Sequence, residues 1–339
     1  MNTLKDSLNF STRKRCLLIA PLSFYSYSEY LKKELSGMGY EVVLSNDEYP
    51  ANSIGKIMGK LKIPILLYTT KQKLYKDYIL GKNYDIVIII KGRGMSHPLI
   101  KELKKICPKV IGYTFDSFKY HPAPKNWYKK LDAFFTFDYK DGISNKVDII
   151  ELFSSLPESE GEKQVQYEIS AIARNHSKRL HFIDGVLSQF PIENNFIYIY
   201  EQNIITFLQN IISSPVLYIK YWKYIYFKPL SYNRYIEILN ISNFVIDFAH
   251  PDQSGITIRC FEAQSARTKV ITNNPNVFKN THFNDLNTIL VEHKKDFSSL
   301  KEKFQNIKKN TPVKYNRNIT AFVNDILEKS NFEICEPNH

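Results

Sequence analysis

Glycine is scarce in this sequence. Only 12 of the 339 residues are glycine, whereas an average usage of about 7% would give roughly 24. Neither GxGxxG nor GxxxxGK(S/T) occurs, and these are the glycine-rich loops that cradle phosphates in nicotinamide dehydrogenases and P-loop NTPases. The sequence therefore disfavours both of those enzyme classes.

Cysteine and long apolar runs are also rare. Cys16, Cys107, Cys260 and Cys335 show no CxxC spacing and have no neighbouring histidine, so they are interpreted as buried free thiols, as in a reducing compartment. The start of the chain is polar, and no apolar run is long enough for a signal peptide or a transmembrane helix. The expected location is the cytoplasm, with peripheral attachment to the inner face of the plasma membrane as an option.

Positive charge is in surplus. Lysine and arginine number 46 against 34 aspartates and glutamates, a formal net charge of +12. Such a surplus favours an anionic partner: a nucleic acid, a phosphorylated small molecule or an acidic membrane surface. No RNP, helix-turn-helix or zinc-finger pattern occurs. A nucleic-acid partner is therefore not expected.

Short β-branched runs alternate with helical patterns, which is typical of parallel α/β units. In the first half, strands are expected at Arg15–Ala20, Glu41–Ser45, Asp85–Ile90, Lys109–Thr114, Ala133–Phe137 and Asp148–Leu152. In the second half, they are expected at Gln166–Ala171, Phe196–Tyr200, Tyr224–Phe227, Phe244–Phe248, Lys269–Thr272 and Thr288–Val291. Helices are expected at about 27–38, 96–106, 176–189, 202–213, 231–241, 255–267, 296–309 and 319–330.

The segment LPESEGEKQ (Leu156–Gln164) is polar and contains Pro157 and Gly161, so it is interpreted as a linker. The predicted division is a first domain of residues 1–156, a linker of 157–164 and a second domain of 165–315. Residues 316–339 form a final helix and tail, for which packing against the first domain is one option.

Ligands of open parallel sheets bind outside the carboxyl ends of the strands. Residues that follow predicted strands are therefore candidates, among them Lys91, Asp116, Arg174 and His250. Two domains that face each other at those ends would form a cleft with the site between them.

The stretch after the Phe244–Phe248 strand is the most informative. Ser254 and Thr257 offer hydroxyl donors beside a predicted helix start, whose free N–H groups suit a phosphate. Arg259 adds a fixed positive charge, and Glu262, one turn further, is spaced to accept hydrogen bonds from a ribose diol. A serine-capped helix with a solvated Arg/Glu pair is the alternative.

This stretch resembles the donor-binding region of GT-B glycosyltransferases, in which a strand, a small polar turn with glycine and a helix with a Glu-Ala pair precede a K/P-V-I-T/S-N strand. The matching pieces are Phe244–Phe248, Ser254-Gly255, Glu262-Ala263 and Lys269–Asn273. The segment HPDQSGITIRCFEA resembles more closely the sequences of bacterial transferases from capsule and lipopolysaccharide loci. The first domain supports this through PLSFYSYSEYLKKELSGMGYEV, IIIKGRGMSHPLIKELKK and FDS.

The resemblance implies an α/β, GT-B-like fold of two Rossmann-type domains that face each other across a cleft. It implies transfer of a hexosyl or related sugar from a nucleotide-sugar, bound by the second domain, to a surface glycan or lipid-linked glycan on the first. The helix Glu262 would hold the donor ribose; Arg259 and the turn with His250 and Gly255 would hold the pyrophosphate. Many retaining members carry an acid where this chain has Ser254, so the stereochemistry stays open.

Arg174 and Arg179 follow the first strand of the second domain. GT-B transferases often place a glycine-rich turn and a cation at this point, and this chain keeps only the cations. A fixed cation stabilises the charge that develops on the departing nucleotide phosphate. A solvated helix start is the alternative interpretation.

The base that deprotonates the acceptor hydroxyl is expected from the first domain. Asp116 is the leading candidate because it follows a strand, and His97 is the second. Lys91 and Tyr27 are assigned to the acceptor side. A turn or N-cap role for Asp116 is the alternative.

No metal or other cofactor is expected. The nearest approach to a metal-chelating DxD triplet is Asp138-Tyr139-Lys140-Asp141, which has the wrong spacing. Aromatic and cationic residues interleave in Tyr218–Tyr235, a pattern typical of single-stranded nucleic acid binding or of a membrane interface. Because this range overlaps a predicted strand, about half of its aromatics are expected in the core.

Two rival functions remain on the same fold. A sugar-nucleotide epimerase would need paired acids and histidines, for which His250 and Asp252 are the candidates. A non-catalytic nucleotide- or glycan-binding protein is favoured by Ser254 in place of an acid and by the missing glycine near Ala173.

Overall fold

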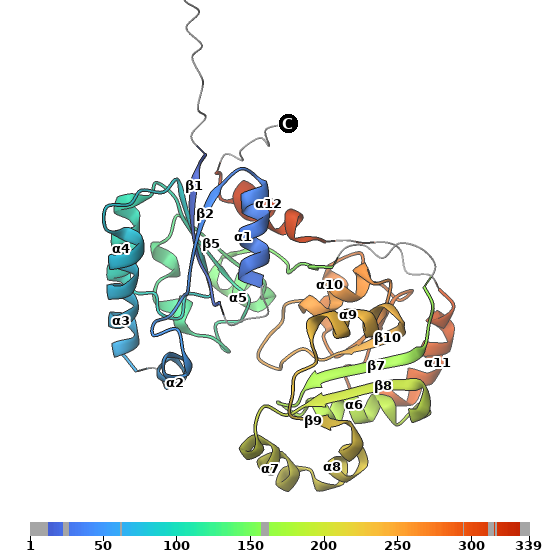
Figure 1. Cartoon of the computed structure of the whole chain (residues 1–339). Coiled ribbons are helices and arrows are strands. Elements are labelled where there is room, and N and C mark those ends of the chain that lie inside the picture. The colour runs from blue at the N-terminus through green and yellow to red at the C-terminus, as the bar shows by residue number, and fades with distance from the viewer. Residues whose placement is uncertain are drawn as a thin grey trace, which may run out of the picture. The chain divides into compact units, whose positions relative to one another are not determined.

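The computed structural model of the protein describes residues 13–22, 27–61, 63–156, 163–293, 295–310, 315 and 317–332. Most of the predicted linker and Cys335 lie outside these residues. Two compact units are present: unit 1 joins residues up to 135 with those from 323 onward, and unit 2 holds residues 136–322 (Figure 1). The domain limits drawn from the sequence stay a prediction.

The first six strands form one sheet in the order β2-β1-β3-β4-β5-β6. The pairs of β1 with β2, of β1 with β3 and of β3 with β4 are parallel. The bounds are β1 Arg15–Ile19, β2 Glu41–Ser45, β3 Ile86–Ile90, β4 Val110–Thr114, β5 Ala133–Thr136 and β6 Asp148–Ile149. β3 is a continuous, fully buried β-branched run, as expected of a strand covered on both faces. All six predicted strands of the first half are confirmed.

The helices of the first half of the chain include three that the sequence did not predict, α2, α3 and α5. α2 begins after Asn52, whose side chain accepts hydrogen bonds from the backbone N–H groups of Ile54 and Gly55. Glycine lowers helix propensity, which hides this helix in the sequence. Gly55 itself is required, because a Cβ there would lie 1.8 Å from the Pro50 carbonyl oxygen. The bounds are α1 Tyr27–Gly37, α2 Ser53–Lys60, α3 Ile65–Leu74, α4 His97–Ile106, α5 Tyr139–Asn145 and α12 Ile319–Lys329.

The second sheet has the order β12-β11-β10-β7-β8-β9, and its neighbouring strands are parallel. The bounds are β7 Tyr167–Arg174, β8 Asn195–Tyr200, β9 Ile225–Tyr226, β10 Ser242–Asp247, β11 Lys269–Thr272 and β12 Thr288–Leu290. These six predicted strands are confirmed as well. The core of unit 2 lies between the central strands and the helices that cover them.

The helices of unit 2 begin later than predicted at two places. The predicted helix 176–189 begins at Arg179, because Ser177 and Lys178 take left-handed backbone angles. The predicted helix 255–267 begins at Ile258, because Thr257 is extended. The bounds are α6 Arg179–Leu187, α7 Ile204–Ser213, α8 Pro215–Tyr221, α9 Tyr232–Asn240, α10 Ile258–Ser265 and α11 Asp296–Lys308.

The aromatic segment Tyr218–Tyr235 divides as predicted between core and surface. Tyr218, Tyr221 and Tyr235 are buried, whereas Trp222 and Phe227 are exposed. The prediction of buried free thiols is confirmed for the three cysteines that the structure describes. Within the described residues, no helix is both long enough and apolar enough to cross a membrane.

Candidate functional site

Two arginines meet at the carboxyl edge of the unit 2 sheet. Arg174 ends β7, is exposed, and donates a hydrogen bond to the Gln202 side chain. Arg179 opens α6 and donates to the carbonyl oxygens of Arg174 and Phe248, each at 3.2 Å. Since Phe248 follows β10, the Arg179 guanidinium joins the ends of two neighbouring strands. Both predicted cations therefore lie at one edge.

Two histidines lie beside these arginines. The rings of His176 and His250 are 5.9 Å apart. Burial, with the positive charges of Arg179 and Arg174, lowers the pKa of His176 to about 4, so this ring is neutral at pH 7. The Asp252 backbone N–H donates to Nδ1 of His250 at 3.1 Å, and the Asp252 carboxylate is 4.0 Å from the same atom. The edge thus combines fixed cations with imidazole groups.

A buried carboxylate that the sequence did not single out supports this edge. Glu201 follows β8 and is fully buried. It accepts hydrogen bonds from Asn175 at 3.0 Å, from Asn210 at 3.2 Å and from the Tyr218 hydroxyl. Asn175 stands between Arg174 and His176, so Glu201 fixes the turn that carries them. Strand-end position, the criterion used for Asp116, would have found it.

A hollow opens beside this network. Its lining residues come from the start of α6 and from α7 and α8: Asn175, His176, Ser177, Lys178, Leu180, His181, Asn210, Ser213, Ser214 and Tyr218. All of them except Leu180 carry a side-chain group that can form hydrogen bonds.

The β10–α10 turn is anchored by Asp138. The backbone N–H of Ser254 donates to one Asp138 carboxylate oxygen at 2.6 Å, and its hydroxyl donates to the other at 2.7 Å. The Ser254 hydroxyl also accepts from the Lys140 backbone at 2.9 Å. A Cβ on Gly255 would lie 2.3 Å from the Phe137 ring. Packing therefore accounts for the Ser-Gly pair, and its contact with phosphate stays a prediction.

The side chains predicted along the helix start are largely engaged within unit 2. The Thr257 hydroxyl donates to buried Asp247 at 2.7 Å. Arg259 donates to the Ile246 carbonyl at 3.2 Å, and its Nε is buried without a hydrogen-bond partner in the described structure. These contacts tie the helix start to the end of β10.

Glu262 is buried, with 2% of its surface exposed, and accepts a hydrogen bond from the Tyr232 hydroxyl at 2.8 Å. Burial raises its pKa to about 7. The alternative of a solvated Arg/Glu pair is therefore wrong, because the helix face that carries Glu262 packs inward. Its contact with a ribose stays a prediction.

In unit 1, Lys91 and Asp116 form an ion pair at the carboxyl edge of the sheet. Lys91 Nζ is 2.6 Å from Asp116 Oδ2, and the side chains are only 12% and 15% exposed. Lys91 follows β3 in a left-handed conformation (φ 62°), which turns the chain at the strand end. His121, which the sequence did not single out, is buried nearby; burial and the Lys91 charge lower its pKa to about 4. His97 is exposed at the first position of α4.

A second charged group lies at the same edge, after β2 and β3. Arg93 binds the Glu48 carboxylate with both oxygens at 3.1 Å. The Arg93 backbone N–H donates to buried Asp47 at 3.1 Å. Burial raises the pKa of Asp47 to about 6. Charges at this edge therefore come with partners of opposite sign.

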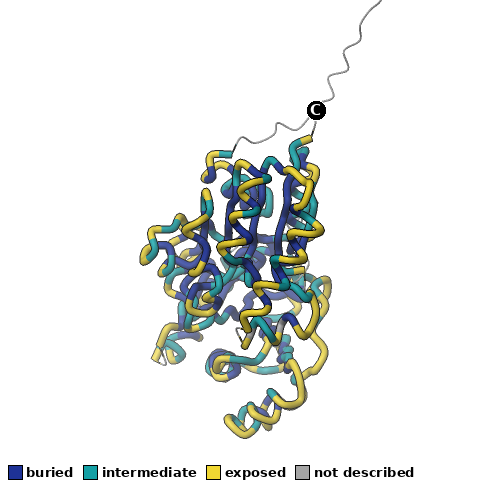
Figure 2. The backbone as a smooth tube through the Cα atoms, turned by 90° about the vertical axis from the view of Figure 1, so that its left-hand side faces the viewer, coloured by how far each residue is buried: buried dark blue, intermediate teal, exposed yellow. Residues whose placement is uncertain are grey.

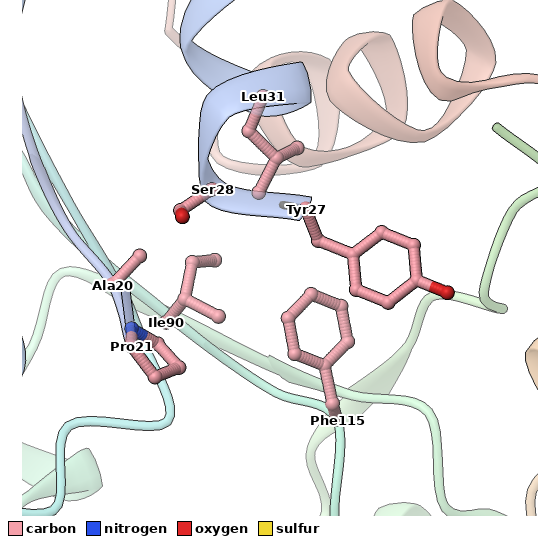
Figure 3. Close-up of a pocket in the computed structure, with 7 residues that line it drawn as sticks. All are labelled: Ala20, Pro21, Tyr27, Ser28, Leu31, Ile90 and Phe115. Carbon is pink, nitrogen blue, oxygen red and sulfur yellow. The ribbon is translucent and has the colours of Figure 1, made fainter. Parts of the chain in front are cut away.

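Tyr27 opens α1 and lines a small apolar pocket in unit 1. Its ring lies beside that of Phe115, above Ala20, Pro21 and Ile90 (Figure 3). From the sequence, Tyr27 and Lys91 are assigned to the acceptor side, and this assignment stays a prediction. The structure sets it among apolar side chains at the strand ends of β1, β3 and β4.

No three His, Cys, Asp or Glu side chains group around a metal-sized space in the part of the chain that the structure describes. Asp138 of the DYKD stretch is buried and serves as the N-cap of α5. Metal-independent binding stays a prediction.

Comparison with protein-family models gave no match, and neither did comparison with curated proteins. Solved structures do match. Sucrose-phosphate synthase from Thermosynechococcus elongatus is 11% identical over 94% of this chain and 98% of its own, with a TM-score of 0.65. The lipopolysaccharide outer core galactosyltransferase WaaB is 12% identical over 93% and 99%, with a TM-score of 0.55.

A putative UDP-N-acetylglucosamine 2-epimerase from Listeria monocytogenes is 11% identical over 96% of this chain and 99% of its own, with a TM-score of 0.51. At these identities the likeness defines the fold and no more. The chain has the α/β architecture of GT-B proteins, with two parallel six-stranded sheets. The predicted fold class is confirmed.

Proposed function

We propose that the chain is a glycosyltransferase that takes a sugar from a nucleotide-sugar bound at the carboxyl edge of the unit 2 sheet. The observation that carries this proposal is the meeting of Arg174 and Arg179 with His176 and His250 at the ends of β7 and β10. An anionic ligand at this edge would meet two guanidinium groups, whose fork geometry matches phosphate oxygens.

The chemistry follows from these fixed charges. As the glycosidic bond breaks, negative charge develops on the departing nucleotide diphosphate. Arg179 is held by two backbone carbonyls, so its charge is in place before the reaction and stabilises the transition state without reorganisation. Donor binding would then need no metal ion. Further contacts are assigned to the β10–α10 segment, from Ser254 to Glu262.

The acceptor is assigned to unit 1. Asp116 would take the proton of the acceptor hydroxyl, and Lys91, whose Nζ lies 2.6 Å from Asp116 Oδ2, holds its carboxylate in place. The proposed acceptor is a bacterial surface glycan or lipid-linked glycan of the capsule or lipopolysaccharide type, at an anionic inner-membrane surface. Similar solved structures support a nucleotide-sugar partner, since one is a galactosyltransferase and another, MnaA from S. aureus, is a complex with UDP.

A thermal-shift panel tests donor binding. UDP, GDP, ADP, TDP, CMP and their common sugar conjugates are compared, since a ligand at a hundred times its Kd stabilises by about 2.7 kcal/mol. A selective rise in Tm supports the proposal and names the nucleotide. No rise with any of them would contradict it.

Arg174→Ala should reduce the rise in Tm that a nucleoside diphosphate causes. The rise in Tm with the corresponding nucleoside, which has no phosphate, should not change. The matched control is Arg234→Ala, which removes another exposed arginine, located in α9, where it pairs with Glu237. Equal losses in both variants would argue against a phosphate contact at Arg174.

An epimerase is the second candidate, favoured by the neighbouring rings of His176 and His250 with Asp252. Epimerisation needs no acceptor, so UDP-N-acetylglucosamine incubated alone with the enzyme separates the two reactions. A new sugar epimer in the NMR spectrum, lost in His250→Asn, supports the epimerase. Product that forms only with a glycan acceptor supports the transferase, and binding without any product would indicate a non-catalytic protein.

A further inference from the structure

Several apolar side chains are strongly exposed on α7, on α8 and on the segment that follows them. We call this the α7–α8 surface; it comprises Ile204, Ile205, Leu208, Ile212, Val216, Ile219, Trp222, Tyr226 and Phe227. Ile212 is 83% exposed and Ile219 is 78% exposed. The two helices lie beyond the edge strand β9 (Figure 1), and this segment is mostly exposed in Figure 2.

The opposite face of these helices is already packed. Phe207, Tyr218 and Tyr221 are buried in the core of unit 2. The Phe207 ring lies 5.6 Å from that of Tyr218 and 5.0 Å from that of Phe227. The outward apolar side chains are therefore additional to a complete core contact. Exposed apolar side chains that gather on one part of a protein mark a site of interaction.

The stretch of chain that forms this surface carries positive charges only. Residues 202–236 contain no aspartate or glutamate, but they contain Lys220, Lys223, Lys228 and Arg234. Lys220 pairs with Asp184 and Arg234 with Glu237, whereas Lys223 and Lys228 are exposed beside Trp222 and Phe227. Lysine beside tryptophan and tyrosine suits the headgroup layer of a bilayer. Lysine is depleted in the cores of protein–protein interfaces.

We propose that the α7–α8 surface attaches the protein to an anionic lipid bilayer. The isoleucine, valine and tryptophan side chains would lie at the boundary of headgroups and acyl chains, with the lysines at the phosphates. The inference rests on the proposed function, which puts the acceptor at an anionic membrane surface, and deepens it by assigning the part of the chain that binds this membrane; the attachment itself needs no sugar nucleotide. It would bring the donor edge of unit 2 to the membrane on which lipid-linked acceptors are carried.

Vesicle co-sedimentation tests the apolar part of the proposal. The full chain is mixed with phosphatidylcholine–phosphatidylglycerol vesicles or with phosphatidylcholine alone. We expect binding to the mixed vesicles and a loss of roughly tenfold or more in Ile212→Ser/Ile219→Ser, because two buried aliphatic side chains are removed. The matched control is Ile143→Ser/Leu286→Ser, which changes two isolated side chains of unit 2 with 72% and 62% exposure. The control should bind as the wild type does.

The charge part is tested by Lys223→Glu/Lys228→Glu. Each cation near an anionic surface contributes about fivefold in affinity, so this variant should lose well over tenfold on mixed vesicles. Unchanged thermal melting of each variant would show that it is folded.

Three outcomes would overturn the proposal. One is equal losses in the control variant. Another is a loss of binding confined to Ile57→Ser/Leu61→Ser, in α2 and directly after it, where both side chains are also exposed. Unit 1 would then be the part of the chain that attaches to the membrane. The third is a wild-type protein that does not bind the vesicles and forms a dimer in sedimentation equilibrium. None of these depends on nucleotide, so a failure here leaves the thermal-shift panel to decide the proposed function separately.

Discussion

The carboxyl edges of the two sheets differ in the oxygen atoms that hold their cations. In unit 1, Lys91 pairs with the Asp116 carboxylate and Arg93 with the Glu48 carboxylate. In unit 2, Arg174 donates to the side-chain amide oxygen of Gln202, and Arg179 donates to the carbonyl oxygens of Arg174 and Phe248. A carbonyl or amide oxygen orients a guanidinium without bringing a negative charge to it. Carboxylates thus position the cations of unit 1, whereas backbone and amide oxygens help to position the arginines of unit 2.

Asp116→Asn changes the ion pair of unit 1 and should have the largest effect of the four variants, on the rate of sugar transfer. Because an amide cannot accept the acceptor proton, we expect the transfer rate to fall by about 10²–10⁴-fold. Donor affinity should change little, since the donor is assigned to unit 2. Rate and nucleotide affinity are measured on the same preparation. A wild-type rate would remove Asp116 from catalysis and make His97 the next residue to test.

Arg179→Lys should weaken the unit 2 edge while keeping its charge. A lysine cannot reach both carbonyl oxygens in fork geometry, so we expect nucleoside diphosphate affinity to fall by about tenfold. Calorimetric titration measures it. If the lysine variant bound as tightly as the wild type, charge alone would suffice and the fixed geometry would be irrelevant.

Asp138→Ala should loosen the turn that the unit 2 edge shares with α10. It leaves the buried N–H and hydroxyl of Ser254 without their acceptor and removes the N-cap of α5. We expect a loss of about 3 kcal/mol in the free energy of unfolding. Denaturant titration measures it, with Asp141→Ala as the neighbouring control, for which a smaller loss is expected.

Glu262→Gln should produce the smallest effect, and one that depends on pH. The folded-state pKa of Glu262 is raised to about 7, so the folded protein binds this proton more tightly than the unfolded chain does. Its stabilising contribution is therefore complete below about pH 4.5 and is lost as the pH rises through about 7. Glutamine does not ionise, so in Glu262→Gln the decrease in the free energy of unfolding between pH 4.5 and 7 should be smaller by on the order of 2 kcal/mol. Unchanged melting profiles between pH 4.5 and 7.5 would contradict it.

Local patterns were sufficient for the strands. The run Ile86–Ile90 could hardly form anything but a buried strand, and all twelve strand positions are confirmed to within a few residues. α2 escaped detection because Gly55 and Gly59 lower its helix propensity, although packing against Pro50 requires Gly55. Helix starts shifted where Ser177 and Lys178 took left-handed angles, which no side-chain pattern announces.

The candidate site was predictable only as far as strand-end positions go. That rule found Arg174, His250, Lys91 and Asp116, and the structure brings Lys91 to Asp116. It could not foresee the burial of Glu262, because the inward face of α10 depends on Tyr232 from another helix. The hydrogen bond between Ser254 and Asp138 joins residues 116 positions apart in the sequence. Local sequence patterns cannot predict a contact between residues so far apart in the chain.

The Asp138–Ser254 anchor bears on how the protein can be divided and in what order it assembles. The β10–α10 turn is completed by residues 137–140, which leave the ribosome more than a hundred residues before it. A fragment cut at residue 165 would contain every strand of the second sheet and still lack the carboxylate that holds this turn. A fragment of 136–322 would keep it. The piece that can be produced alone is therefore set by one aspartate rather than by the polar stretch at 157–164.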